Sequence, residues 1–125
     1  TINNDKTIDY YGNIYINNII TEIPIKFREI NGNLSIVYCN MKSLKNMPDR
    51  INGKLSILES TIGDFSGCTK YVSESVLISK CKLDRIDNLF DFVGGTLTVY
   101  ENIISEVTCP IPTNDSCILY NNNMI

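Results

Sequence analysis

Histidine is absent from the 125-residue sequence. Its absence removes the commonest general base, the Ser-His and Cys-His pairs of nucleophilic catalysis, and most zinc and copper sites. The one double glycine, Gly94-Gly95, is followed by neither a helix pattern nor a Lys-Ser/Thr pair, so it indicates a tight turn rather than a phosphate-binding loop. We therefore expect a protein that is not an enzyme and that uses no cofactor and no metal.

Concentrated charge and long apolar runs are missing as well. The net charge is −3 and the 11 lysines and arginines do not cluster, so we expect neither a nucleic acid nor a membrane as a partner. The five cysteines are an odd number and form no C-x-x-C pair, and no secretory signal segment is recognisable. These features favour a reduced, cytoplasmic protein.

The sequence does contain a regular repeat of apolar positions. Counted from Gly32 as position zero, apolar residues stand at +2, +4, +9 and +12, and the spacing returns from Gly53, Glu74 and Gly95. Two further columns lie two residues before each start and at +15, and over these four copies every column position except Pro110 is apolar. A constant period of this length is the signature of a solenoid. The +2 and +4 columns contain Leu34, Ile36, Leu55, Ile57, Val76, Ile78, Leu97 and Val99.

Each copy predicts one coil of a single domain that spans residues 1–125. The +2 and +4 pair has the period of a β-strand, and stacking the coils at about 4.8 Å lets each strand bond to its neighbours. Repeats start near residues 12, 32, 53, 74, 95 and 116, and residues 1–11 form an N-terminal cap or a partial repeat. The first copy is one residue short between Ile16 and Ile23, so we expect a different turn there.

The pattern Leu34-x-Ile36-x-x-Cys39-x-Met41-x-x-Leu44 resembles the leucine-rich repeat, L-x-L-x-x-N/C-x-L-x-x-L. The short period is similar to that of the repeats of bacterial effectors and of leucine-rich-repeat-like phage proteins. The resemblance implies a right-handed arc with a parallel β-sheet on the concave face, extended or 3-10 convex segments and little α-helix. It also implies that the protein binds another macromolecule, in a bacterial or a phage-infected cell.

The +7 column is occupied by small residues that suit an inward-facing turn position. They are Cys39, Ser60, Cys81, Asn102 and Asn123. Each can hydrogen-bond the turn backbone from inside the coil. We expect Cys39 and Cys81 to be free, because two coils separate them by about 10 Å.

Strand alternation places the +3, +5 and +6 columns on the concave face if +2 and +4 point inward. These columns bring apolar and tyrosine side chains together within a polar rim, which is typical of a binding surface. The predicted partner-binding residues are Tyr15, Val37, Tyr38, Leu58, Leu77, Tyr100 and Leu119. Glu59 and Glu101, about 10 Å apart on this sheet, are interpreted as solvated surface charges rather than as catalytic acids.

Two hypotheses about function follow. The first is a non-enzymatic protein-binding module, such as a phage or bacterial effector that occludes a host or defence protein through its concave sheet. The alternative is a structural, self-associating repeat protein, a homo-oligomer that pairs through an uncapped last strand ending at Ile125.

Overall fold

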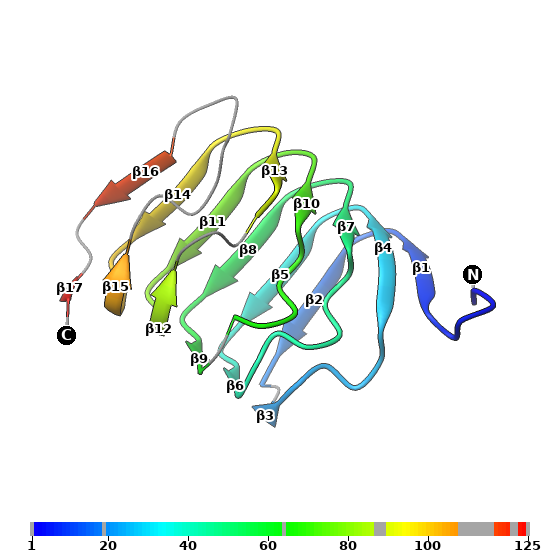
Figure 1. Cartoon of the computed structure of the whole chain (residues 1–125), viewed down its shortest axis with the longest axis horizontal. Helices are drawn as coiled ribbons and strands as arrows, with labels where there is room; N and C mark the ends of the chain where they lie inside the picture. Colours follow the sequence, from blue (N-terminus) through cyan, green and yellow to red (C-terminus); the bar gives the residue numbers. More distant parts are fainter. Residues whose placement is uncertain are drawn as a thin grey trace.

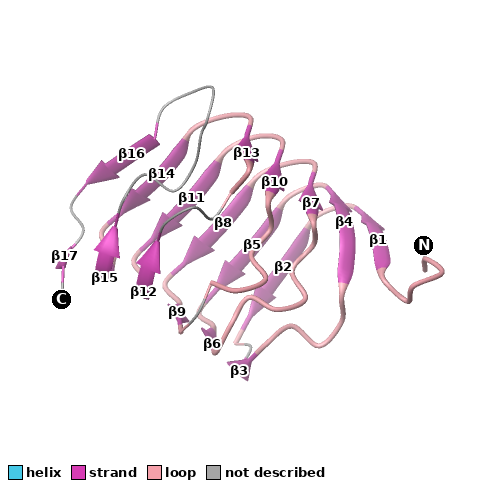
Figure 2. Ribbon diagram, in the orientation of Figure 1, coloured by secondary structure: helices cyan, strands magenta, loops and turns pink. Residues whose placement is uncertain are grey.

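The chain is a parallel β-solenoid built from three sheets (Figures 1 and 2). The computed structural model describes residues 2–18, 20–63, 65–86, 90–107, 117–120 and 123–124. These residues form strands, turns and bends, with no helix among them. Consequently no helix in the described part of the chain could cross a membrane. The predicted solenoid with little α-helix is confirmed.

Each of the first five coils contributes one strand to each sheet, the last contributes β16 and β17 to the second and third sheets, and neighbouring strands in a sheet are parallel. The first sheet contains β1 (Ile8–Tyr11), β4 (Phe27–Asn31), β7 (Arg50–Ile51), β10 (Tyr71–Val72) and β13 (Phe92–Val93). The second sheet contains β2 (Ile14–Asn17), β5 (Leu34–Val37), β8 (Leu55–Leu58), β11 (Val76–Ser79), β14 (Leu97–Tyr100) and β16 (Cys117–Tyr120). The third sheet contains β3 (Ile20–Thr21), β6 (Asn40–Met41), β9 (Thr61–Ile62), β12 (Lys82–Ile86), β15 (Ile103–Val107) and β17 (Asn123–Met124).

The predicted apolar columns become continuous buried ladders. In the second sheet Leu34 pairs with Leu55 and Ile36 with Ile57, so each column residue lies against its equivalent in the next coil. Both of these pairs are at most 1% exposed. Identical apolar faces thus cover one another along the solenoid, which stabilises coils that could not bury a core alone.

The segments predicted to return over the convex side also pair with one another. The crossing residues form the third sheet, and the residues two positions before each start form the first sheet. Their strands are mostly two residues long, because a β-coil needs only a short straight side between two corners. Gly94-Gly95 lies in the bend between β13 and β14, as predicted.

Close coil stacking accounts for glycine at the start of the repeat. A Cβ atom added to Gly53 would lie 2.2 Å from the carbonyl oxygen of Gly32, far inside van der Waals contact. Glycine therefore lets the backbones of successive coils approach at this corner.

The first and last coils depart from the predicted register. β1 pairs with β4, so residues 8–11 belong to a partial repeat that extends the first sheet. In the first coil Thr21 still pairs with Met41, so the residue that this coil lacks is missing after Thr21. Asn18 has the same left-handed turn as the equivalent residues of later coils, so the prediction of a different turn there is wrong. In the last coil Leu119 pairs with Val99 instead of Thr98, so this coil begins one residue earlier in the sequence than predicted.

Candidate functional site

The outward face of the second sheet carries most of the predicted binding residues. Tyr15 is 62% exposed and Tyr38 is 57% exposed. Leu58, Leu77 and Tyr100 are half-buried among neighbouring outward residues. The structure therefore brings these five side chains onto one side of the solenoid, as strand alternation requires.

Two predicted residues take different positions from the other five. Val37 lies in the outward +5 column but is only 9% exposed, because neighbouring rows about 4.8 Å away cover a short side chain. Leu119 pairs with Val99 and therefore falls in the +4 column instead of the +3 column. Ile118 takes the predicted place of Leu119, since it pairs with Thr98. Both residues are apolar and adjacent, so the repeat pattern alone does not distinguish between them.

A row of left-handed residues marks the corner between the second and third sheets. We call it the corner row, and it consists of Asn18, Tyr38, Glu59, Lys80 and Glu101, with φ values of 57°, 55°, 49°, 55° and 58°. One such residue per coil turns the chain by the same amount each time. Left-handed backbone is costly for L-residues other than glycine and asparagine, so a corner row of Tyr, Glu and Lys is held in place by the stacked coils.

The +7 residues fix this corner from the inside. Ser60 Oγ accepts a hydrogen bond from the Cys39 N–H at 3.1 Å and donates one to the Leu58 carbonyl at 2.8 Å. Asn102, two coils further on, accepts the equivalent bond from the Cys81 N–H at 2.8 Å and donates to the Ile78 carbonyl of the preceding coil at 3.1 Å. The predicted role of the +7 column in bonding the turn backbone is confirmed for Ser60 and Asn102, while the side chain of Asn123 lies outside the described part of the chain.

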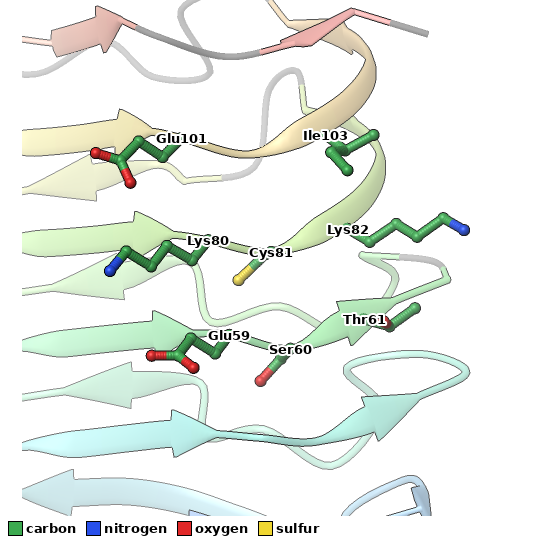
Figure 3. A pocket seen from close by; sticks show the side chains of 8 residues that line it. All are labelled: Glu59, Ser60, Thr61, Lys80, Cys81, Lys82, Glu101 and Ile103. Atoms are coloured by element: carbon green, nitrogen blue, oxygen red, sulfur yellow. The ribbon is translucent and has the colours of Figure 1, made fainter.

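A shallow groove of about 320 Å³ runs along the corner across three coils. It is lined by Glu59, Ser60, Thr61, Lys80, Cys81, Lys82, Glu101 and Ile103. Figure 3 shows the side chains of Glu59, Lys80 and Glu101 stacked one above another and pointing the same way. Lys82 and Ile103 point to the opposite side, over the third sheet. The groove therefore lies between the charged side chains of Glu59, Lys80 and Glu101, beside the second sheet, and the outer face of the third sheet.

Charge along the corner row alternates from coil to coil. Lys80 stands between Glu59 and Glu101, and all three are exposed. The negative charge of Glu59 and its hydrogen bond with the phenol raise the pKa of Tyr38, which keeps that hydroxyl protonated. In the part of the chain that the structure describes, the ion pairs are Lys26–Asp49 and Arg28–Asp9, and neither involves the corner row.

The thiol in the groove is chemically unreactive. Burial raises the pKa of Cys81 to about 11, and its Sγ donates to the Ser79 carbonyl at 3.2 Å. Only a thiolate attacks electrophiles or binds metals readily, so this cysteine is a structural residue. Cys39, Cys68 and Cys81 are all free and buried, as predicted for Cys39 and Cys81. Residues 2–18, 20–63, 65–86, 90–107, 117–120 and 123–124 contain no cluster of three or more metal-ligating side chains.

On the first sheet, Tyr71 and Phe92 form a separate aromatic row that is satisfied within the chain, whereas Tyr10 and Tyr11 of β1 are exposed. The Arg50 guanidinium lies 3.9 Å from the centre of the Tyr71 ring, and the Tyr71 and Phe92 rings stack with centres 5.0 Å apart. These contacts are made between adjacent coils and stabilise the first sheet. The exposed Tyr15 and Tyr38 are therefore better candidates than Tyr71 for contact with another molecule.

The sequence did not predict the corner row as a structural feature. Strand alternation predicts that its members lie on the binding face, because they follow the strand, but it does not predict their left-handed backbone. Asn18 is the one member whose residue type favours that conformation, so the signal available was weak. Comparison with known proteins adds nothing to this assignment, because no protein-family model, curated protein or solved structure matches the chain.

Proposed function

We propose that the protein is a non-enzymatic binding module whose outward face of the second sheet covers a surface of another protein. The observation that carries the proposal is the grouping of Tyr15, Tyr38, Leu58, Leu77 and Tyr100 on one rigid sheet. Tyrosine is enriched in protein interfaces because its ring gives a large apolar contact at low entropic cost and its hydroxyl tolerates water.

Rigidity of the framework supports this function. Every strand of the second sheet except the two at its ends is paired on both sides, and its inward side chains are buried. Side chains on such a sheet are positioned before binding, so less conformational entropy is lost on association. Binding over a broad sheet would act by occlusion or by scaffolding.

The test compares two surface variants in a pull-down followed by calorimetry. Tyr38→Asn removes the aromatic ring yet suits the left-handed backbone at that position, so folding is preserved. Combined with Leu77→Ser at the centre of the face, it is expected to weaken binding of a captured partner at least tenfold. Lys45→Glu, an exposed substitution away from the second sheet, is the control and should bind normally.

The proposal fails if the double variant keeps wild-type affinity while Lys45→Glu loses it. That result would move the interaction to the turns between the third and first sheets. Thermal unfolding of all three proteins is measured in parallel, so that a loss of fold is not read as a loss of binding.

A further inference from the structure

The order of residues in the corner row is complementary to its own reverse. Read along the solenoid, the four members of the row that follow Asn18 are Tyr38, Glu59, Lys80 and Glu101. Read in the opposite direction the order is Glu101, Lys80, Glu59 and Tyr38. When the two orders are aligned, each residue lies opposite a residue that can hydrogen-bond to it or that carries the opposite charge. We infer that the partner of the outward face of the second sheet is a second copy of this chain, packed with its solenoid axis antiparallel. This inference rests on the proposed function and names its partner.

A two-fold axis parallel to the strands produces this arrangement. The axis lies midway between the two facing sheets, at the level between the coil of β8 and the coil of β11. It places each column opposite the same column of the second copy and reverses the order of the coils. A two-fold interface uses the same patch on both copies, so every contact occurs twice. The pairs in the corner row are Glu59 with Lys80 of the second copy, and Tyr38 with Glu101 of the second copy.

Charge is complementary at the two central positions of this row, and the outer pair of Tyr38 and Glu101 is one of hydrogen-bond donor and acceptor. Each Lys80 would lie beside Glu59 and Glu101 of its own chain and opposite Glu59 of the second copy. Coils repeat at about 4.8 Å in both molecules, so the rows stay in step over their full length. Opposite charges arranged this way fix the register of an interface and suppress other registers.

Side-chain size is complementary in the sheet columns as well. In the +5 column the larger Leu58 lies opposite Ser79 of the second copy, and Tyr100 lies opposite the largely covered Val37. In the +3 column Leu77 lies opposite Ser56. A large side chain thus faces a smaller one in each of these rows, which favours close contact of the two sheets.

Other registers lose these pairings. An axis passing through the coil of β11 would place Lys80 opposite Lys80 and Glu59 opposite Glu101. An axis passing through the coil of β8 would place Glu59 opposite Glu59 and Leu58 opposite Leu58. Like charges directly opposed across an interface are unfavourable, so the axis between these two coils is selected.

The size of the face indicates a dimer of modest affinity. Six strands at about 4.8 Å, each four residues long at about 3.3 Å per residue and the first five followed by a corner residue, give a patch of about 29 Å by 17 Å. That is on the order of 500 Å², compared with about 800 Å² per partner in a standard interface. We expect dissociation in the micromolar range and weakening by salt.

Sedimentation velocity over a micromolar concentration series tests the arrangement through charge swaps. Wild-type protein is expected to dimerise. Glu59→Lys and Lys80→Glu each place like charges opposite one another twice and should weaken the dimer at least tenfold. An equimolar mixture of the two variants restores opposite charges at both pairs and should form a heterodimer, and a chain with both changes should dimerise with itself. The backbone at position 80 accommodates glutamate, as it does at Glu59 and Glu101.

Lys82→Glu is the matched control, because Lys82 lies two residues away with the same charge but points over the third sheet (Figure 3). It should dimerise as the wild type does. The inference is overturned if wild-type protein is monomeric over the whole series, if mixing fails to restore the dimer, or if Lys82→Glu weakens it equally. Should the wild type be monomeric while the outward face still captures a different protein, the proposed function stands and only the second copy is excluded as its partner.

Discussion

Replacing Asn102 by alanine tests whether the inward corner residues stabilise the solenoid. The side chain accepts a hydrogen bond from the Cys81 N–H at 2.8 Å and donates one to the Ile78 carbonyl at 3.1 Å, and it is fully buried. Alanine would leave the Cys81 N–H without its acceptor and out of reach of water, and it would remove the side-chain donor to the Ile78 carbonyl, whose strand stays paired in the sheet. An orphaned buried N–H costs about 1 to 3 kcal/mol and a lost hydrogen bond about 1 kcal/mol, so we expect a loss of about 2 to 4 kcal/mol.

Urea denaturation at low protein concentration measures this loss without a contribution from self-association. With a slope of about 1 to 3 kcal/mol per molar urea, a loss of about 3 kcal/mol lowers the unfolding midpoint by about 1 to 3 M. Asn102→Ser should recover part of the loss, because Ser60 accepts the equivalent hydrogen bond from the Cys39 N–H. Glu101→Gln, a substitution of the exposed residue adjacent to Asn102, should leave the urea midpoint unchanged. An Asn102→Ala midpoint equal to that of the wild type would refute the role assigned to the +7 column.

Three further predictions concern the core, the ion pair and the thiol. Ile57→Asp should unfold the array by burying an unpaired charge, whereas Ser56→Asp on the outward side should be tolerated, and equal melting temperatures would contradict this. The Arg28 guanidinium lowers the pKa of Asp9, so this ion pair stabilises the fold at pH values above the usual pKa of an aspartate. Its contribution is lost as the pH falls through the lowered pKa, so the difference in stability between the wild type and Asp9→Asn should shrink in acid. Burial raises the pKa of Cys81 to about 11, so mass spectrometry should find it alkylated at pH 8 only after denaturation.

The coil and its core could be predicted because every coil repeats the same apolar columns. A column such as Leu34, Leu55, Val76 and Leu97 reports burial and strand alternation at once, and all four are at most 1% exposed. The pairing of the return segments could not be predicted, since strands of two residues, such as β7 and β10, are too short to show a period.

The candidate face was predictable in outline but not in its details. Alternation placed Tyr15, Leu77 and Tyr100 outward, because it depends only on the period of two. How far a side chain projects depends on its neighbours in adjacent coils, which is why Val37 is covered. The predicted register of the last coil is off by one residue, because the consecutive apolar residues in this coil fit either register.

The left-handed corner row had almost no signal in the sequence. Backbone with positive φ is usually announced by glycine or asparagine, yet most members of this row are larger or charged. Here the stacked coils and the inward hydrogen bonds impose the conformation on whatever residue follows the strand. The side chains at that position are consequently free to serve recognition.

Site-specific photo-cross-linking tests the central claim, that the outward face of the second sheet is the binding surface, most directly. A photoreactive phenylalanine replaces Leu77, which is half-buried at the centre of this face, and in a second protein it replaces the exposed Lys45. Irradiation in lysate followed by mass spectrometry identifies what each position contacts. The account predicts a specific protein adduct from position 77, which is a second copy of the chain if the dimer forms, and none from position 45. Adducts from position 45 with none from position 77 would contradict it.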